Sequence, residues 1–247
     1  MHQFIVSSDE INEGSLVIKG DEAHHLIYVL RLKEGSIIAL FDGKGSRSLA
    51  RIENIARDSV QAHILETLPN NEPPIEVILY QALPKRDKLE FIIQKAVELG
   101  VSQIIPIVTK RTIVRMNDRK TENRVHRWDK ISLEACKQAG RSRVPAIGEP
   151  MFFNKAVKKP VSRFLLMPFE GEDQRGLKQV LAEARESKTT SIGVFIGPEG
   201  GWDSEEVAVA KAAGVITVSL GPRILRTETA SMAVLSMIMY ELGDLGG

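Results

Sequence analysis

The chain has 247 residues, of which 43% are hydrophobic and 26% charged, and its formal net charge is +1. This composition is ordinary for a soluble globular protein, the length predicts two domains, and no apolar stretch is long enough to span a bilayer. The first residues lack the pattern of a secretory signal, and the single cysteine, Cys136, excludes an internal disulfide, so we expect a cytoplasmic protein.

The charged residues are unevenly distributed along the chain. Residues 110–143 contain eleven Lys or Arg against four Asp or Glu, whereas residues 1–72 contain seven basic and eleven acidic side chains. A basic run of this kind is commonly the solvated face of a helix. It is equally the electrostatic pattern of a nucleic-acid-binding surface, and charge alone leaves both interpretations open.

The residues before the first proline-rich stretch are predicted to form a small β-barrel or compact β-domain. Apolar segments of strand length are separated by turn residues, at 15–20, 36–45, 48–56 and 59–68. The sequence DGKG at 42–45 predicts a hairpin between two of these strands. A helix is predicted over 21–35, ended by Gly35, because apolar residues recur there at helical spacing: Ala23, Leu26, Ile27 and Leu30.

The segment LPNNEPP at 68–74 predicts a linker, which places the domain boundary between residues 72 and 73. After it the pattern changes to alternating strands and helices. The expected strands are apolar along their whole length, at 75–83, 102–108, 163–169, 191–198 and 214–222. Such strands are typical of a mostly parallel sheet covered by helices on both faces, so residues 73–247 are predicted to form an α/β domain.

Three helices of this domain are visible from their apolar periodicity. One begins near Leu89 and ends at Gly100, and a second runs from about Val125 to Gly140. The third, roughly 229–242, is apolar nearly all round. Burial of one face would not require this many apolar residues, so a subunit interface along this helix is expected.

Three loops that follow expected strands carry the most informative residues: LMPFEGE at 166–172, IGPEGGWD at 196–203 and LGPRILRTETA at 220–230. Ligands of α/β sheets bind beyond the carboxyl ends of the strands. Glycine and proline also occur in ordinary tight turns, which is the alternative for any one loop. Asp203 with Glu206 predicts a capped helix start, and Thr227 or Thr229 predicts another.

The ligand that these loops could hold is constrained by what they lack. Neither the GxGxxG dinucleotide pattern nor the GxxxxGK[ST] phosphate loop is present. Glu199 would repel phosphate, so we expect a weakly charged ligand or one with a positive centre, approached closely by the glycine backbone. The five histidines are too scattered for a zinc site, and no metal is assigned.

Two arginines, Arg223 and Arg226, lie beside the start of the last expected helix. They could bind phosphate or stabilise an oxyanion. Alternatively, one of them could simply form an ion pair with Glu228.

Several stretches together resemble the RsmE family of methyltransferases, which make N3-methyluridine in 16S ribosomal RNA of the small subunit. They are IGPEGGWDSEE, LGPRILRTETA, ALPKRDKLEFIIQKAVELGVSQIIPI and RWDKISLEACKQAGRSRVP, with HHLIYVLRLKEG and FDGKG nearer the N-terminus. The resemblance implies an RNA-binding PUA-like β-barrel at 1–72. It implies a SPOUT α/β domain with a deep C-terminal trefoil knot at 73–247, which binds S-adenosylmethionine (SAM). It also implies a homodimer with the site near the subunit interface.

The resemblance implies roles for individual residues. The cofactor would be bound by Leu166, Met167, Pro168, Ile196, Gly197, Pro198, Glu199, Gly200, Gly201, Leu220, Gly221, Leu225 and Ala230. Arg226 is expected to stabilise the charge that develops on the uridine carbonyls, and Glu228 is a candidate general base, with Glu199 as the other nearby carboxylate. From charge and resemblance, RNA phosphates are expected to contact Arg31, Arg47, Lys85, Arg86, Arg111, Arg115, Arg141 and Arg143.

Two alternatives stay open at this point. The chain could be a non-catalytic RNA-binding or ribosome-assembly factor on the same fold. It could also be a SPOUT enzyme with a different RNA target, such as transfer RNA ribose.

Overall fold

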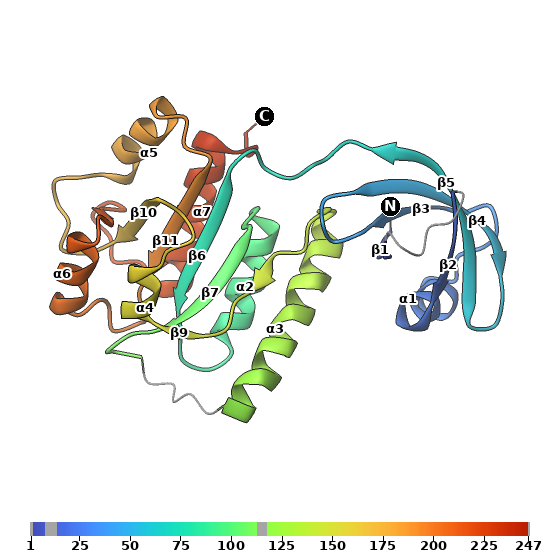
Figure 1. The fold of residues 1–247 in the computed structure, drawn as a ribbon, viewed down its shortest axis with the longest axis horizontal. Helices are drawn as coiled ribbons and strands as arrows, with labels where there is room; N and C mark the ends of the chain where they lie inside the picture. Colours follow the sequence, from blue (N-terminus) through green and yellow to red (C-terminus); the bar gives the residue numbers. More distant parts are fainter. Residues whose placement is uncertain (1, 8–13, 113–117, 247) are drawn as a thin grey trace. The chain divides into compact units, whose positions relative to one another are not determined.

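The computed structural model describes residues 2–7, 14–112 and 118–246, and the chain folds into two compact units (Figure 1). The first unit contains residues 1–72 together with 136–144, and the second contains residues 73–135 together with 145–247. Within the described residues, no helix is long and apolar enough to cross a membrane.

The first unit is built on one five-stranded sheet with the order β1-β3-β4-β5-β2. All neighbouring strands are antiparallel except β1 and β3, and the predicted hairpin at 42–45 joins β3 to β4. Apolar side chains alternate along the strands and form the core of the unit, with Phe4, Ile18, Leu40 and Ile52 almost fully buried. The strands are β1 (Gln3–Ile5), β2 (Ser15–Lys19), β3 (Ile37–Phe41), β4 (Arg47–Ile55) and β5 (Ser59–Leu68).

The helix expected at 21–35 is present but shorter than predicted. It consists of α1 (Gly20–His24) and one turn of π-helix, η2 (His25–Val29), and Ala23 and Leu26 are its buried residues. The chain leaves the helix well before Gly35, because Arg31 has a positive φ of 51° that a right-handed helix cannot contain.

The segment 136–144 is attached to the first unit by a buried ion pair. Arg141 Nη2 lies 2.5 Å from Glu72 Oε2, and both side chains are 8% exposed. The other Glu72 oxygen accepts hydrogen bonds from the backbone N–H groups of Ser142 and Arg143. Burial raises the pKa of the Glu72 carboxyl, but these hydrogen bonds and the Arg141 charge bring that pKa below its ordinary value. Glu72, the last residue before the domain boundary, therefore holds the segment 136–144 through contacts about 70 residues away in the chain.

The second unit contains the predicted parallel sheet, in the order β12-β10-β11-β6-β7-β8, with β9 also paired to β7. Every strand pair in it is parallel. The strand ends that precede the three glycine- and proline-containing loops therefore meet at one edge. The strands are β6 (Glu76–Ala82), β7 (Gln103–Val108), β8 (Ala146–Ile147), β9 (Met151–Phe152), β10 (Phe164–Pro168), β11 (Ser191–Ile196) and β12 (Ile216–Val218).

Helices cover both faces of this sheet (Figure 1). On one face, α4 and α6 pack over a core that includes Tyr80, Phe153, Phe195 and Trp202. On the other face, α7 packs against β6 and β11 and contacts α2 and α5. The helices are α2 (Lys88–Glu98), α3 (Asp118–Ala139), α4 (Phe153–Lys158), α5 (Leu177–Glu186), α6 (Ser204–Ala212) and α7 (Thr227–Leu242).

The last helix is amphipathic in its burial although its sequence is apolar on most sides. Ser231, Val234, Leu235, Ile238 and Met239 are buried against the rest of the unit. On the opposite side, Met237 is 41% exposed and Tyr240 is 73% exposed. Among the residues that the structure describes in a single chain, α7 is therefore covered on one side only.

Candidate active site

A pocket of about 670 Å³ lies at the edge of the sheet where β10, β11 and β12 end. Its walls come from the loops that follow these strands, from the first turn of α7 and from the start of α2. This volume falls in the range of small-molecule sites. The three loops that the sequence suggested do converge on one cavity.

Most residues predicted to bind the cofactor line this pocket. They are Pro168, Ile196, Gly197, Pro198, Glu199, Gly201, Leu220, Gly221, Leu225 and Ala230. Leu166 and Met167 do not, because both side chains are fully buried within β10, and only Pro168 at the strand end reaches the edge. Gly200 also lies outside the lining, and a Cβ at this position would lie 3.5 Å from the Arg111 side chain.

The pocket has further lining residues to which the sequence analysis assigned no part in cofactor binding. They are Lys88, Phe169, Glu170, Glu172, Asp173, Trp202, Ser219, Pro222, Ile224 and Thr227, together with Arg223 and the predicted catalytic residue Arg226. Phe169, Glu170 and Glu172 belong to the loop at 166–172 that the sequence had already indicated, and Asp173 directly follows that loop. Lys88 could have been found because β6 ends at the same edge of the sheet.

Close packing shapes the floor of the pocket around the β11 loop. Trp202 Nε1 donates to the Pro168 carbonyl at 3.1 Å, so the indole links the loops after β10 and β11. A Cβ at Gly197 would lie 3.2 Å from this ring, and Gly201 has a positive φ of 69°. Glycine is required at Gly201 by its backbone conformation and is favoured at Gly197 by the approach of the indole.

A polar network joins β6, the β11 loop and α7, and Gln81 and Ser231 within it are fully buried. Thr227 Oγ1 donates to the Gly197 carbonyl at 2.6 Å and accepts from Gln81 Nε2 at 3.0 Å. Ser231 Oγ donates to Gln81 Oε1 at 2.6 Å. The predicted N-cap role of Thr227 or Thr229 is wrong, because the N-cap is Arg226, and the Thr227 hydroxyl binds the neighbouring loop instead. The network holds the first turn of α7 against the pocket floor.

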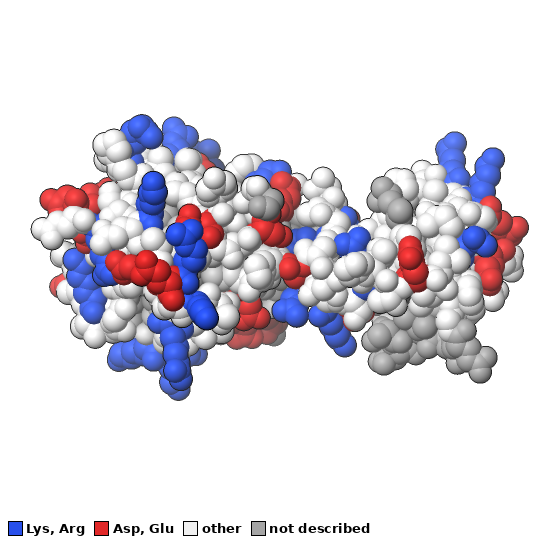
Figure 2. Space-filling view, turned by 90° about the horizontal axis from the view of Figure 1, so that it is seen from above, with Lys and Arg blue, Asp and Glu red and all other residues white. Residues whose placement is uncertain are grey.

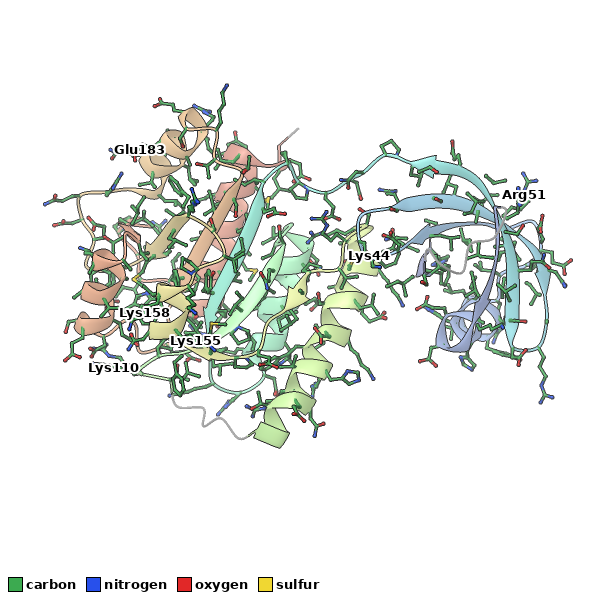
Figure 3. All side chains as sticks on the ribbon, viewed as in Figure 1. Lys44, Arg51, Lys110, Lys155, Lys158 and Glu183 are labelled. Carbon is green, nitrogen blue, oxygen red and sulfur yellow. The ribbon has the colours of Figure 1, made fainter. Side chains whose placement is uncertain are left out.

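The outer side of the β11 loop is held by the loop that follows β7. Arg111 Nη1 donates to the Gly200 carbonyl at 2.7 Å, and Lys110, labelled in Figure 3, forms ion pairs with Asp203 and Glu205 at the start of α6. The predicted capping box of Asp203 and Glu206 is confirmed. Hydrogen bonds from the Glu205 backbone and from Lys110 lower the pKa of the Asp203 carboxyl.

Lys88 connects two carboxylates across the pocket. Its Nζ lies 3.2 Å from Glu228 Oε1 and 3.6 Å from Glu199 Oε1, and the latter oxygen also accepts the Lys85 backbone N–H at 3.0 Å. Burial raises the pKa of the Glu228 carboxyl, but its own backbone N–H, the Lys88 hydrogen bond and the charges of Lys88 and Arg226 bring that pKa below its ordinary value. Both candidate bases are therefore engaged in ion pairs.

The residues predicted to contact RNA have different environments. Arg31, Lys85, Arg86 and Arg143 are exposed, and Arg47 is half-buried. Arg141 is 6% exposed and paired with Glu72, so it lacks the exposure that a phosphate contact needs. Arg111 is exposed but holds the β11 loop, and Arg115 lies outside the described residues. Figure 2 shows Lys and Arg interspersed with Asp and Glu on the face drawn there.

The chemistry of the pocket fits a compact ligand that is partly apolar and carries a positive centre. Ile196, Leu220, Leu225 and the Phe169 ring offer apolar walls, while Glu170 and its neighbours offer negative charge. Among the residues that the structure describes, no cluster of His, Cys, Asp or Glu could hold a metal ion.

Comparison with known proteins agrees with this arrangement. The RNA methyltransferase domain family matches residues 71–239, and the RNA methyltransferase PUA domain family matches residues 18–65. A Bacillus subtilis protein named ribosomal RNA small subunit methyltransferase E is 35% identical over 98% of this chain and 96% of its own length. This chain belongs to the RsmE family.

Other RsmE proteins support the assignment. The Synechocystis protein of the same name is 33% identical over 96% of this chain and 77% of its own length. The crystal structure of the Neisseria gonorrhoeae protein bound to S-adenosyl methionine has a TM-score of 0.87, with 32% identity and 99% coverage of both chains. RsmE relatives thus share the complete two-unit fold.

Proposed function

We propose that this chain transfers a methyl group from SAM to N3 of a specific uridine in 16S ribosomal RNA of the small subunit. The observation that carries the proposal is the convergence of the three strand-end loops on one pocket that Arg226 also lines. The names of the RsmE relatives supply the substrate, and the SAM-bound Neisseria structure supplies the cofactor. When bound, SAM provides a methyl group on a positively charged sulfur, which leaves as a neutral thioether.

The residues of the chain then have separate tasks. Main-chain groups and apolar side chains of the three loops would hold the cofactor, with the carboxylates after β10 favouring its positive charge. N3 of uridine carries a proton, and when this proton leaves, negative charge spreads onto O2 and O4. A guanidinium that approaches one of these oxygens stabilises that charge, by roughly 3 kcal/mol for a well-placed donor. We assign this role to Arg226.

Glu228 is not assigned the role of base. Its carboxylate is paired with Lys88, and its lowered pKa makes it a weak proton acceptor. Glu199 is similarly occupied by the Lys85 amide and by Lys88. We propose that the N3 proton passes to solvent.

The finer features of the family are proposals for this chain. They are closure of the first unit into a PUA-like barrel that orients RNA, a deep trefoil knot in the SPOUT domain, a cytoplasmic location and a homodimer. The exposed Met237 and Tyr240 on α7 support a dimer interface. Arg31, Arg47, Lys85, Arg86 and Arg143 remain the proposed phosphate contacts.

The test is tritiated methyl transfer from SAM to isolated small ribosomal subunits and to transfer RNA, followed by nucleoside analysis. We expect N3-methyluridine in the small-subunit RNA. Arg226→Ala should lower transfer about a hundredfold while calorimetry shows SAM affinity nearly unchanged. Equal loss of both would refute the role of Arg226. RNA binding without any SAM binding would favour the non-catalytic factor, and methylated transfer RNA would favour a different SPOUT enzyme.

A further inference from the structure

Lys88 stands at a position where the local rules of helix formation disfavour a lysine. It is the first residue of α2, and the partial positive charge of a helix N-terminus repels cations. An interaction outside the helix must therefore compensate for the unfavourable position. Residues that break a local rule in this way are expected at functional sites.

The compensating interaction is the pairing of Lys88 with two carboxylates, which come from two different walls of the pocket. Glu228 belongs to the first turn of α7, and Glu199 belongs to the β11 loop. Lys88 Nζ reaches both oxygens of Glu228 at 3.2 Å and Glu199 Oε1 at 3.6 Å. The three side chains are only 19–35% exposed, so solvent screens the pairs less than it would on an open surface.

Arg226 is the N-cap of α7, directly before its first turn and two residues before Glu228. An ion pair that fixes Glu228 relative to the β11 loop therefore fixes the backbone from which the Arg226 guanidinium extends. A displacement of about 1 Å in a catalytic group can cost as much as a hundredfold in rate. The buried Thr227 network holds the inner side of this turn, and Lys88 holds its outer, solvent-facing side.

We propose that Lys88 is a positioning residue for methyl transfer, which acts through Glu228 and Glu199 to place Arg226 at the substrate. The inference rests on the proposed function. In this proposal Glu228 forms an ion pair with Lys88 and does not accept the proton. Lys88, Glu199 and Glu228 therefore act as one unit, the Lys88 ion pairs.

The experiment compares Lys88→Met, Lys88→Arg, Glu228→Gln and the Lys88→Met/Glu228→Gln double variant with wild type. Lys95→Met is the matched control, because Lys95 pairs with Glu98 on the same helix outside the pocket lining. At saturating SAM and ribosomal subunits, we expect kcat to fall roughly tenfold in Lys88→Met and in Glu228→Gln. The double variant should be no slower than either single one, Lys88→Arg should retain most of the rate, and KM for the subunit should stay unchanged.

A second readout does not require activity. Amide hydrogen exchange in the first turn of α7 should accelerate in Lys88→Met and Glu228→Gln, return toward wild type in Lys88→Arg, and stay unchanged in Lys95→Met. This measurement still tests the Lys88 ion pairs if the wild-type protein transfers no methyl group. Such a lack of transfer would refute the proposed function and not the role of these ion pairs.

Three results would overturn the inference. A raised KM for the subunit at unchanged kcat would make Lys88 a phosphate contact. Additive losses in the double variant, with Glu228→Gln the more damaging single change, would make Glu228 a proton acceptor. Wild-type kcat and exchange in Lys88→Met would leave Lys88 without a role in the site.

Discussion

The hydroxyl of Thr227 gives the sharpest test of how the pocket is held together. Thr227→Val removes this hydroxyl with little change in side-chain volume. The Gln81 Nε2 group then loses one of its two hydrogen-bond acceptors in a fully buried environment, and the Gly197 carbonyl loses its donor. Replacing the hydroxyl by a methyl group therefore removes hydrogen-bond partners from these polar groups without opening a cavity.

The expected magnitude follows from the burial of these groups. A buried polar group that loses its partner costs about 1–3 kcal/mol, and the Gly197 carbonyl, at the pocket wall, contributes at the lower end of that range. We therefore expect Thr227→Val to lower the free energy of local opening of α7 by about 2–3 kcal/mol. This corresponds to roughly 30- to 150-fold faster amide exchange along α7.

Native-state hydrogen exchange on the isolated protein measures this effect, because it reports local opening separately from unfolding of the whole chain. Thr227→Ser is the matched control, since it keeps the hydroxyl and loses only a methyl group. Its α7 amides should exchange close to the wild-type rate. Equal exchange in the valine and serine variants would show that the network does not hold α7, and the physical account of the pocket floor would fail.

Further predictions concern the glycines, the thiol and the buried ion pair. Gly201→Ala should weaken SAM binding measured by calorimetry, because the residue lines the pocket at positive φ, whereas Gly200→Ala should not; equal affinities would place the ligand elsewhere. Burial raises the pKa of Cys136 to about 12, so iodoacetamide at mildly alkaline pH should modify it only after unfolding, and rapid labelling of the folded chain would contradict this. Glu72→Gln should lower the free energy of unfolding of the first unit by about 3 kcal/mol at neutral pH, measured by urea unfolding. The reason is that the buried Arg141 charge loses the Glu72 carboxylate. Because folding lowers the pKa of Glu72, its ionised carboxylate stabilises the fold fully above the ordinary carboxyl pKa, and this stabilisation is lost as pH falls toward the folded pKa. If Glu72→Gln and wild type still differed in free energy of unfolding in acid, the assignment would be refuted.

Local sequence patterns were sufficient for most elements of the fold. The continuous apolar runs became parallel strands because such runs can be buried on both faces. Gly100 and Gly140 end their helices with positive φ of 88° and 71°, a backbone conformation that side chains rarely adopt. The strand-end loops converge because parallel strands place their carboxyl ends at one edge.

The features that were missed depend on contacts between distant residues. Arg141 belongs to a basic run, and the sequence gives no sign that its charge meets a buried Glu72 from another part of the chain. For the same reason, the segment 136–144 could not be assigned to the first unit. Leu166 and Met167 were placed in the pocket because of the family resemblance, but both lie inside β10 with fully buried side chains, and only Pro168 lies at the strand end.

These contacts also explain why a glycine-rich loop can form a precise binding surface. Glycines alone would make the β11 loop flexible, and ordering such a loop on binding costs affinity. Here Glu199 is tied to the Lys85 amide, the Gly200 carbonyl to Arg111 and the Gly197 carbonyl to Thr227. The loop thus keeps the close backbone approach that glycine permits, while three neighbouring elements supply the rigidity that glycine lacks. Because two of these anchors come from the loops that carry Lys85 and Arg111, a force on those loops from bound RNA would be transmitted directly to the pocket.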